Sequence, residues 1–187
     1  MRAMRRLLVI SAALLCALSV AGCFNKHEVT VAETEGIYLD VDELKYQVQI
    51  SRVLNPTNPE DRSYLVGLDR SQAELPAGQE WFAVFMRVQN EDDQPHPAAR
   101  DYTITDTQDT KFRPIQLGPD NVFAYRAGNV GPKSLIPAPD SPPSESTIQG
   151  SLLLFKIPTR NLENRPLELS IRSPEDPGQV ATVDLDV

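Results

Sequence analysis

Short segments in which apolar and polar side chains alternate recur along the chain and restrict its fold more than any other feature. The alternation is clear in residues 44–51, 102–105, 167–172 and 181–187. Because successive side chains of a β-strand point to opposite faces, a period of two predicts strands with one buried face. Most of the regular structure is therefore expected to be β-sheet.

One segment, residues 81–88, is apolar on both faces for most of its length. This pattern is typical of a central strand that is covered on both sides, or of a strand at the tightest part of a sandwich core. Further short β-like pieces are expected at residues 112–115, 122–125 and 148–157, and polar turns rich in proline separate the strands.

The proline content favours strands over helices, since the chain has 16 prolines and proline removes a backbone donor. No segment has a convincing helical period, although residues 42–45 or 159–164 are candidates for a helical turn. Five prolines rule out regular structure through most of a long loop at residues 129–147. About seven to nine short strands with turns between them predict one all-β domain, an antiparallel β-sandwich spanning residues 37–187.

The first residues have the pattern of an export signal. A basic start with three arginines precedes an apolar run of 14 residues, 7–20, which is shorter than the roughly 20 residues that span a bilayer as a helix. Val20, Ala21, Gly22 and Cys23 then form a lipobox. This segment resembles a bacterial lipoprotein signal peptide covering residues 1–22.

The resemblance implies that Cys23 carries a diacylglycerol thioether and an N-acyl chain. Cys16 lies in the signal, so no thiol remains in the mature part for a disulfide or a zinc site. A diacyl anchor makes membrane binding stable. We expect residues 23–36 to be the lipidated cysteine and a polar tether, on the extracytoplasmic face of a cell membrane or outer membrane; Phe24 in place of Asp does not favour inner-membrane retention.

The charge of the mature chain argues against nucleic acid as a partner. After residue 22 there are 15 basic and 26 acidic side chains, a net charge of −11. Binding a phosphate backbone requires clustered lysine and arginine, whereas here these residues are scattered singly among carboxylates. Solubility is the simplest role for the negative charge.

The mature part is similar to the immunoglobulin-like domains of unknown function in secreted Gram-positive, especially actinobacterial, lipoproteins. The similarity is carried by the central strand with its following Gln94 and Pro95, and by apolar or turn positions in later strands: Tyr102, Ile104, Asp106, Phe112, Gly150, Leu152, Leu154 or Phe155, Pro158, Leu167 and Leu169. The resemblance implies an immunoglobulin-like sandwich and supplies no catalytic residues. The long proline-rich loop departs from the short Pro-Gly turn that the family commonly has before Gly150.

No set of residues predicts catalysis, and neither a metal nor a cofactor is expected. His96 stands in a loop and is expected to be a solvated side chain. The acidic group Glu91, Asp92, Asp93 and Asp101 is a candidate for calcium, but it lacks the spacing of an EF-hand loop, and a solvated turn is favoured.

Two segments are candidates for binding. Trp81, Tyr102 and Tyr125 are candidates for a ligand site, although core packing is favoured for residues on strands. The proline-rich loop is the stronger candidate for a partner, because proline pre-organises an extended backbone; a rigid spacer or a cover over a sheet edge is an equal alternative. Its proposed binding residues are Leu135, Ile136, Pro137, Pro139, Pro142 and Pro143.

The sequence therefore predicts a membrane-anchored, non-enzymatic binding or structural module. Its partner would be an envelope protein, a glycan or a small ligand. The alternative is an accessory subunit of an envelope transporter or enzyme complex that docks through the proline-rich loop.

Overall fold

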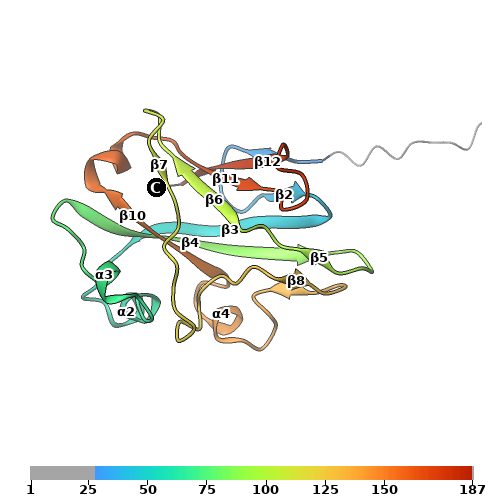
Figure 1. Cartoon of the computed structure of the whole chain (residues 1–187), viewed down its shortest axis with the longest axis horizontal. Coiled ribbons are helices and arrows are strands. Elements are labelled where there is room, and N and C mark those ends of the chain that lie inside the picture. Colours follow the sequence, from blue (N-terminus) through green and yellow to red (C-terminus); the bar gives the residue numbers. More distant parts are fainter. Residues whose placement is uncertain (1–27, 187) are drawn as a thin grey trace, which may run out of the picture.

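The computed structural model describes residues 28–186, which form two facing β-sheets with short helices on one side (Figure 1). Sheet A has the strand order β1 (Val31–Ala32), β12 (Val180–Leu185), β11 (Leu167–Arg172), β6 (Asp101–Thr105) and β7 (Lys111–Phe112). Sheet B has the order β10 (Ser151–Pro158), β4 (Gln79–Asn90), β3 (Leu44–Leu54) and β2 (Tyr38–Val41). All pairs between these strands are antiparallel except β1 with β12, which is parallel.

Smaller elements complete the described chain. β9 (Leu135–Ile136) pairs with β4, and β5 (His96–Pro97) pairs with β8 (Asn129–Val130). The helices are α2 (Pro59–Tyr64), α3 (Arg70–Ala73), α4 (Pro142–Glu145) and the 3₁₀ helix η1 (Thr159–Glu163). None of the helices within residues 28–186 has the length and apolar character needed to cross a bilayer.

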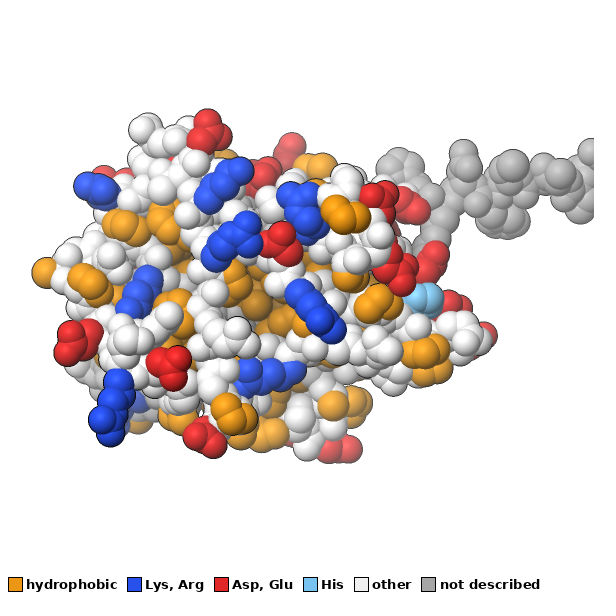
Figure 2. Space-filling model, in the orientation of Figure 1, with side chains coloured by type: hydrophobic (Ala, Val, Ile, Leu, Met, Phe, Trp, Pro, Cys, Tyr) orange, Lys and Arg blue, Asp and Glu red, His pale blue; other side chains and the backbone are white. Residues whose placement is uncertain are grey.

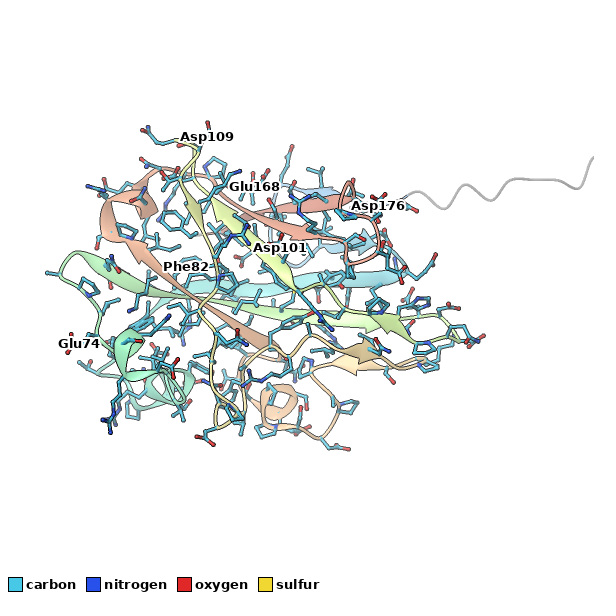
Figure 3. The ribbon with its side chains drawn as sticks, in the orientation of Figure 1. Glu74, Phe82, Asp101, Asp109, Glu168 and Asp176 are labelled. Carbon is cyan, nitrogen blue, oxygen red and sulfur yellow. The ribbon has the colours of Figure 1, made fainter. Side chains whose placement is uncertain are left out.

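The main core lies between the sheets and consists of the inward side chains of every long strand. Phe82 marks its centre (Figure 3). From sheet B it takes alternate residues of β2, β3, β4 and β10, and from sheet A it takes Ile104 together with the inward positions of β11 and β12. The alternation in the sequence thus predicts the inner faces of the sandwich correctly.

A second core covers the outer face of sheet B. Trp81, Ala83 and Phe85 of β4 point away from sheet A and pack with Leu152 and Leu154 of β10. Tyr64 of α2 closes this cluster by edge-on contact with Phe85, at a ring centroid distance of 5.0 Å. The structure therefore has three layers, which explains why the sequence of β4 is apolar on both faces.

The β-sandwich and the helical turn at residues 159–164 are confirmed. The helical turn at residues 42–45 is wrong: Asp42, with a positive φ of 51°, lies in the β2–β3 turn, and β3 begins at Leu44. Residues 122–125 form no strand either, since only Ala124 makes a β-bridge, with Leu152.

The predicted polar tether, residues 23–36, extends too far at its C-terminal end, which is the part that the structure describes. Residues 31–36 belong to the fold, because β1 pairs with β12 and the Glu35 carboxylate accepts hydrogen bonds from the main-chain N–H groups of Ser51 and Asp186 at 3.1 and 3.2 Å. The signal peptide, with Val20, Ala21, Gly22 and Cys23, lies outside the described residues.

The proline-rich loop also contains more regular structure than expected. β9 and α4 lie within residues 129–147, together with β8. Asn90, at the end of β4, ties this segment to the sandwich: its buried side-chain amide donates hydrogen bonds to the carbonyl oxygens of Gln94, Val130 and Gly131 at 2.7, 3.0 and 3.0 Å. Proline has no backbone N–H to donate. In this segment the hydrogen bonds of β8, of β9 and of the Asn90 side chain satisfy backbone groups instead.

Candidate binding cleft

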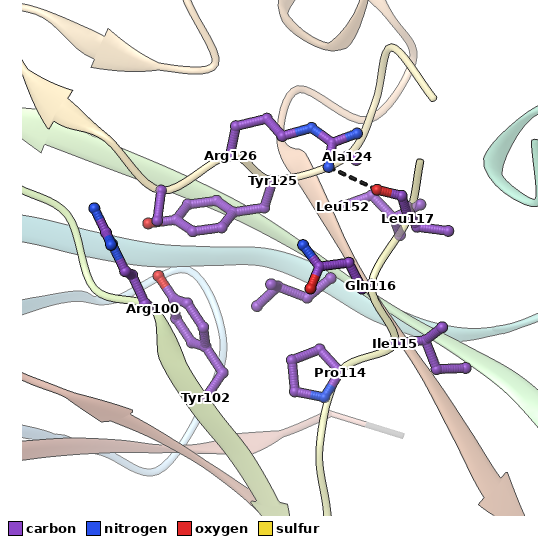
Figure 4. A pocket seen from close by; sticks show the side chains of 12 residues that line it. Arg100, Tyr102, Pro114, Ile115, Gln116, Leu117, Ala124, Tyr125, Arg126 and Leu152 are labelled. Atoms are coloured by element: carbon purple, nitrogen blue, oxygen red, sulfur yellow. Dashed lines mark hydrogen bonds between the residues drawn. The ribbon is translucent and has the colours of Figure 1, made fainter. Parts of the chain in front are cut away.

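A cleft of about 520 Å³ opens beside β10, where both cores come to the surface (Figure 4). The start of β6 forms one wall, with Arg100 and Tyr102. Residues 114–117 form the opposite wall, residues 124–127 cover the top, and Leu152 and Leu153 form the floor. We call this the β10 cleft.

Main-chain hydrogen bonds to β10 hold the walls in place. After β7 the chain crosses the free edge of β10, where the N–H of Ile115 donates to the carbonyl oxygen of Leu154 at 2.7 Å. It then turns and crosses the edge again, where the N–H of Tyr125 donates to the carbonyl oxygen of Leu152 at 2.8 Å. These crossings protect an exposed sheet edge and leave the cleft between them.

Two tyrosine hydroxyls fix the peptide next to Arg100. The N–H of the buried residue Ala99 donates to the Tyr46 hydroxyl at 2.8 Å, and the Tyr125 hydroxyl donates to the carbonyl oxygen of Ala99 at 3.0 Å. Tyrosine phenols are neutral near pH 7, and burial raises the pKa values of Tyr46, Tyr102 and Tyr125 further above that pH. They serve the cleft as neutral hydrogen-bonding groups.

The Tyr102 hydroxyl is the unusual group of the cleft. Tyr102 is only 2% exposed, and its ring packs edge-on against Tyr125 at a centroid distance of 5.3 Å. Within residues 28–186 its hydroxyl forms no hydrogen bond of normal geometry, and its nearest polar neighbour is the Tyr125 side chain, toward which it points in Figure 4. A buried hydroxyl with so weak a contact leaves part of the cost of its burial uncompensated.

Arginine side chains give the cleft a positive rim. Arg126 donates to the carbonyl oxygens of Leu117, at 2.7 Å, and Gly118, which ties the top of the cleft to its far wall. Arg100 is exposed on the other side. No carboxylate of the described chain lines the cleft, and Figure 2 shows basic side chains spaced around an apolar hollow in the middle of this face.

The tyrosines permit a direct test of the geometry. Tyr46→Phe should lower the free energy of unfolding by about 1–3 kcal/mol, because the buried N–H of Ala99 loses its acceptor. Tyr102→Phe should cost less than about 0.5 kcal/mol or stabilise the domain, because the hydroxyl it removes forms no hydrogen bond of normal geometry within residues 28–186. Urea denaturation measures both changes, and equal losses in the two variants would show that the Tyr102 hydroxyl is paired in solution.

The other candidate residues from the sequence, Trp81 and His96, do not line the cleft. Trp81 lies in the second core, where the Lys156 ammonium sits 4.8 Å from its ring centroid, so it does not join Tyr102 and Tyr125. The Nε2 atom of His96 lies 2.7 Å from a carboxylate oxygen of Asp92.

The acidic residues considered for calcium have separate partners. Asp93 pairs with Lys133 at 3.2 Å, and Asp101 pairs with Arg113 at 3.1 Å. Within residues 28–186 no three His, Cys, Asp or Glu side chains lie close enough to hold a metal ion.

The six loop residues proposed for partner binding divide into two groups. Leu135 and Ile136 form β9 against β4, and Pro137 and Pro143 are buried. Only Pro139 and Pro142 are exposed, so most of the segment is engaged by the domain itself. A smaller cavity of about 220 Å³ lies beside it, lined in part by Arg87, Leu135 and Pro139.

Comparison with known proteins gives fold-level similarity only. No protein-family model matches the chain, and no curated protein matches it. Two solved structures are similar in fold. The first is the yjhA protein from Bacillus subtilis, with a TM-score of 0.48 and 8% sequence identity; the match covers 82% of this chain and 99% of that one. The second is an uncharacterized beta-sandwich protein from Clostridium difficile 630, with a TM-score of 0.43 and 12% sequence identity; the match covers 86% of this chain and 99% of that one.

Proposed function

We propose that this protein is a lipid-anchored, non-enzymatic binding module on the extracytoplasmic face of a cell membrane or outer membrane, and that its ligand occupies the β10 cleft. The observation that carries the proposal is the lining of that cleft, where two exposed arginines, Arg100 and Arg126, stand beside apolar side chains and no carboxylate of residues 28–186 is present. The cleft volume, about 520 Å³, lies within the range of small-molecule sites.

Anchoring rests on the sequence before the described residues. The lipobox ends at Cys23, and β1 begins at Val31, so few residues separate the lipid from the sheet. The domain would stay close to the membrane surface, where a diacyl anchor holds it stably.

We further propose that the sandwich is immunoglobulin-like. The neighbours β6, β11 and β12 in sheet A have the arrangement of strands C, F and G in that fold, and β10 beside β4 has the arrangement of strands E and B. The additional hairpin β2–β3 widens sheet B.

The anchor has a matched pair of cysteines for its test. Cys23→Ala should move the protein from the membrane fraction to the soluble or secreted fraction and abolish labelling with palmitate, because the lipid acceptor is lost. Cys16→Ala, in the expected signal peptide, should change neither. If the Cys23→Ala protein remains in the membrane fraction and takes up label, the anchoring proposal is wrong.

Native mass spectrometry tests binding in the same preparations. A ligand that is retained by the mature parent domain and lost after Ala127→Trp, which adds a large ring to the half-buried top of the cleft, supports the proposal. Retention of the ligand by the filled variant would place it elsewhere and contradict the assignment of the site. Circular dichroism must show that the variant keeps its β-structure.

The alternative function is an accessory subunit of an envelope transporter or enzyme complex, with docking through Pro139 and Pro142. Both prolines are exposed, and Pro139 lines the cavity of about 220 Å³, which favours this role. A stoichiometric membrane-protein partner in a pull-down, lost in the Pro139→Ala and Pro142→Ala double variant, would favour this role over the binding module. Substitution is preferable to deletion because β9 and α4 belong to the fold.

A further inference from the structure

We propose that the ligand of the β10 cleft is a small amphiphilic anion, with a carboxylate-type head between Arg100 and Arg126 and an apolar or aromatic body on the floor. This inference rests on the proposed binding function and adds the chemical class of the ligand. Three features of the cleft support it: the donors at its rim, the apolar side chains on its far wall and floor, and its lack of acidic groups.

The rim offers positive charge that the described chain does not use in ion pairs. Arg52, Arg113 and Arg172 each pair with an aspartate. Arg100 and Arg126, like most other arginines in residues 28–186, form no ion pair with a carboxylate, and they differ from those others in that both line the same cleft. The guanidinium of Arg126 has five N–H donors and uses two for carbonyl oxygens, so donors remain for an anion.

The walls and floor suit an apolar body. Ile115 and Leu117 line the far wall, Leu152 and Leu153 line the floor, and the ring of Tyr125 adds aromatic surface. Such a surface stabilises a hydrocarbon or aryl group by its removal from water.

The sign of the head group follows from what the lining of the cleft lacks. With no carboxylate lining the cleft, a cationic ligand has no counter-charge there. The arginines would repel it.

Three probes with one aryl body separate these contributions: 4-phenylbutyrate, 4-phenylbutanol and 4-phenylbutylammonium. Isothermal titration calorimetry with the mature domain should give 4-phenylbutyrate a Kd at least about tenfold below that of the alcohol, because its head gains charge-assisted hydrogen bonds. The ammonium compound should bind more weakly than the alcohol. Added salt should weaken binding of the acid and leave binding of the alcohol unchanged.

Arg100→Gln tests the location of the anion, since its exposed side chain makes no contact that the fold requires. It should raise the Kd of 4-phenylbutyrate about fivefold or more and leave that of 4-phenylbutanol unchanged. Arg70→Gln, in α3, is the control: it makes the same change in net charge on an exposed side chain and should have no effect.

The outcomes distinguish this inference from the proposed function. Equal affinity for the acid and the alcohol, preference for the ammonium compound, or equal effects of the two arginine variants would overturn the anion class. If native mass spectrometry nevertheless shows a ligand that the parent domain retains and the cleft-filling variant loses, the binding function stands and only the chemical class of the ligand is wrong.

Discussion

Replacing Phe85 with alanine lowers the free energy of unfolding by about 3–5 kcal/mol, the usual cost of removing a buried phenylalanine. Phe85 is fully buried at the centre of the second core, in edge-on contact with Tyr64. Gly150 packs so closely above it that a Cβ there would lie 3.0 Å from the main-chain carbon and the Cβ of Phe85. The site therefore has little freedom to collapse around the missing ring.

Urea denaturation followed by tryptophan fluorescence measures this loss, because Trp81 lies in the same cluster. Val122→Ala is the control on the same side of the molecule: Val122 is 58% exposed, and its substitution should change the free energy of unfolding by less than about 0.5 kcal/mol. A loss below about 1 kcal/mol for Phe85→Ala would mean that the outer layer is not closely packed on sheet B in solution.

Asn90→Asp is expected to destabilise the domain by about 2–4 kcal/mol although it hardly changes the shape of the side chain. Three carbonyl oxygens accept hydrogen bonds from the Asn90 amide, and a carboxylate oxygen in its place is an acceptor facing acceptors. The remaining contact, in which the side-chain oxygen of Asn90 accepts from the N–H of Asp92 at 2.8 Å, is kept. The variant therefore isolates the three donated bonds.

Thermal denaturation measures the overall loss, and hydrogen exchange locates it. Protection should fall first at residues 129–134, which Asn90 ties to the sandwich. Gln94→Glu makes the same amide-to-carboxylate change at an exposed neighbour and should leave the melting temperature nearly unchanged. Unchanged protection at residues 129–134 in Asn90→Asp would indicate that other contacts hold the segment.

The long strands could be predicted because the alternation of apolar and polar residues within each strand shows which of its faces is buried. The two-sided pattern of residues 81–88 likewise predicted a covered central strand, which β4 confirms. The short elements could not be predicted in this way. β1 has only two residues, and it is a strand because β12, far away in the sequence, pairs with it. Residues 122–125 have a strand-like sequence because they pack on β10, but only one residue, Ala124, forms a β-bridge there.

The cleft was only partly visible in the sequence. Tyr102 and Tyr125 were singled out as aromatic candidates, but Trp81, grouped with them, points to the opposite side of sheet B. Arg100 and Arg126 were missed because no motif or spacing joins them. The chain brings them together by crossing the edge of β10 twice, and that crossing depends on long-range hydrogen bonds rather than local pattern.

The parallel pairing of β1 with β12 has a consequence for how the chain acquires its structure as it is made. The N-terminal residues emerge first, whether from a ribosome or, in the exported protein proposed above, from a translocation pore, so β2, β3 and β4 are available early and can form a meander of sequential neighbours. Sheet A cannot follow, because β11 and β12 begin only at Leu167 and Val180 and β1 must wait for them. During that interval the meander presents an uncovered apolar surface, which exposes the incomplete chain to aggregation.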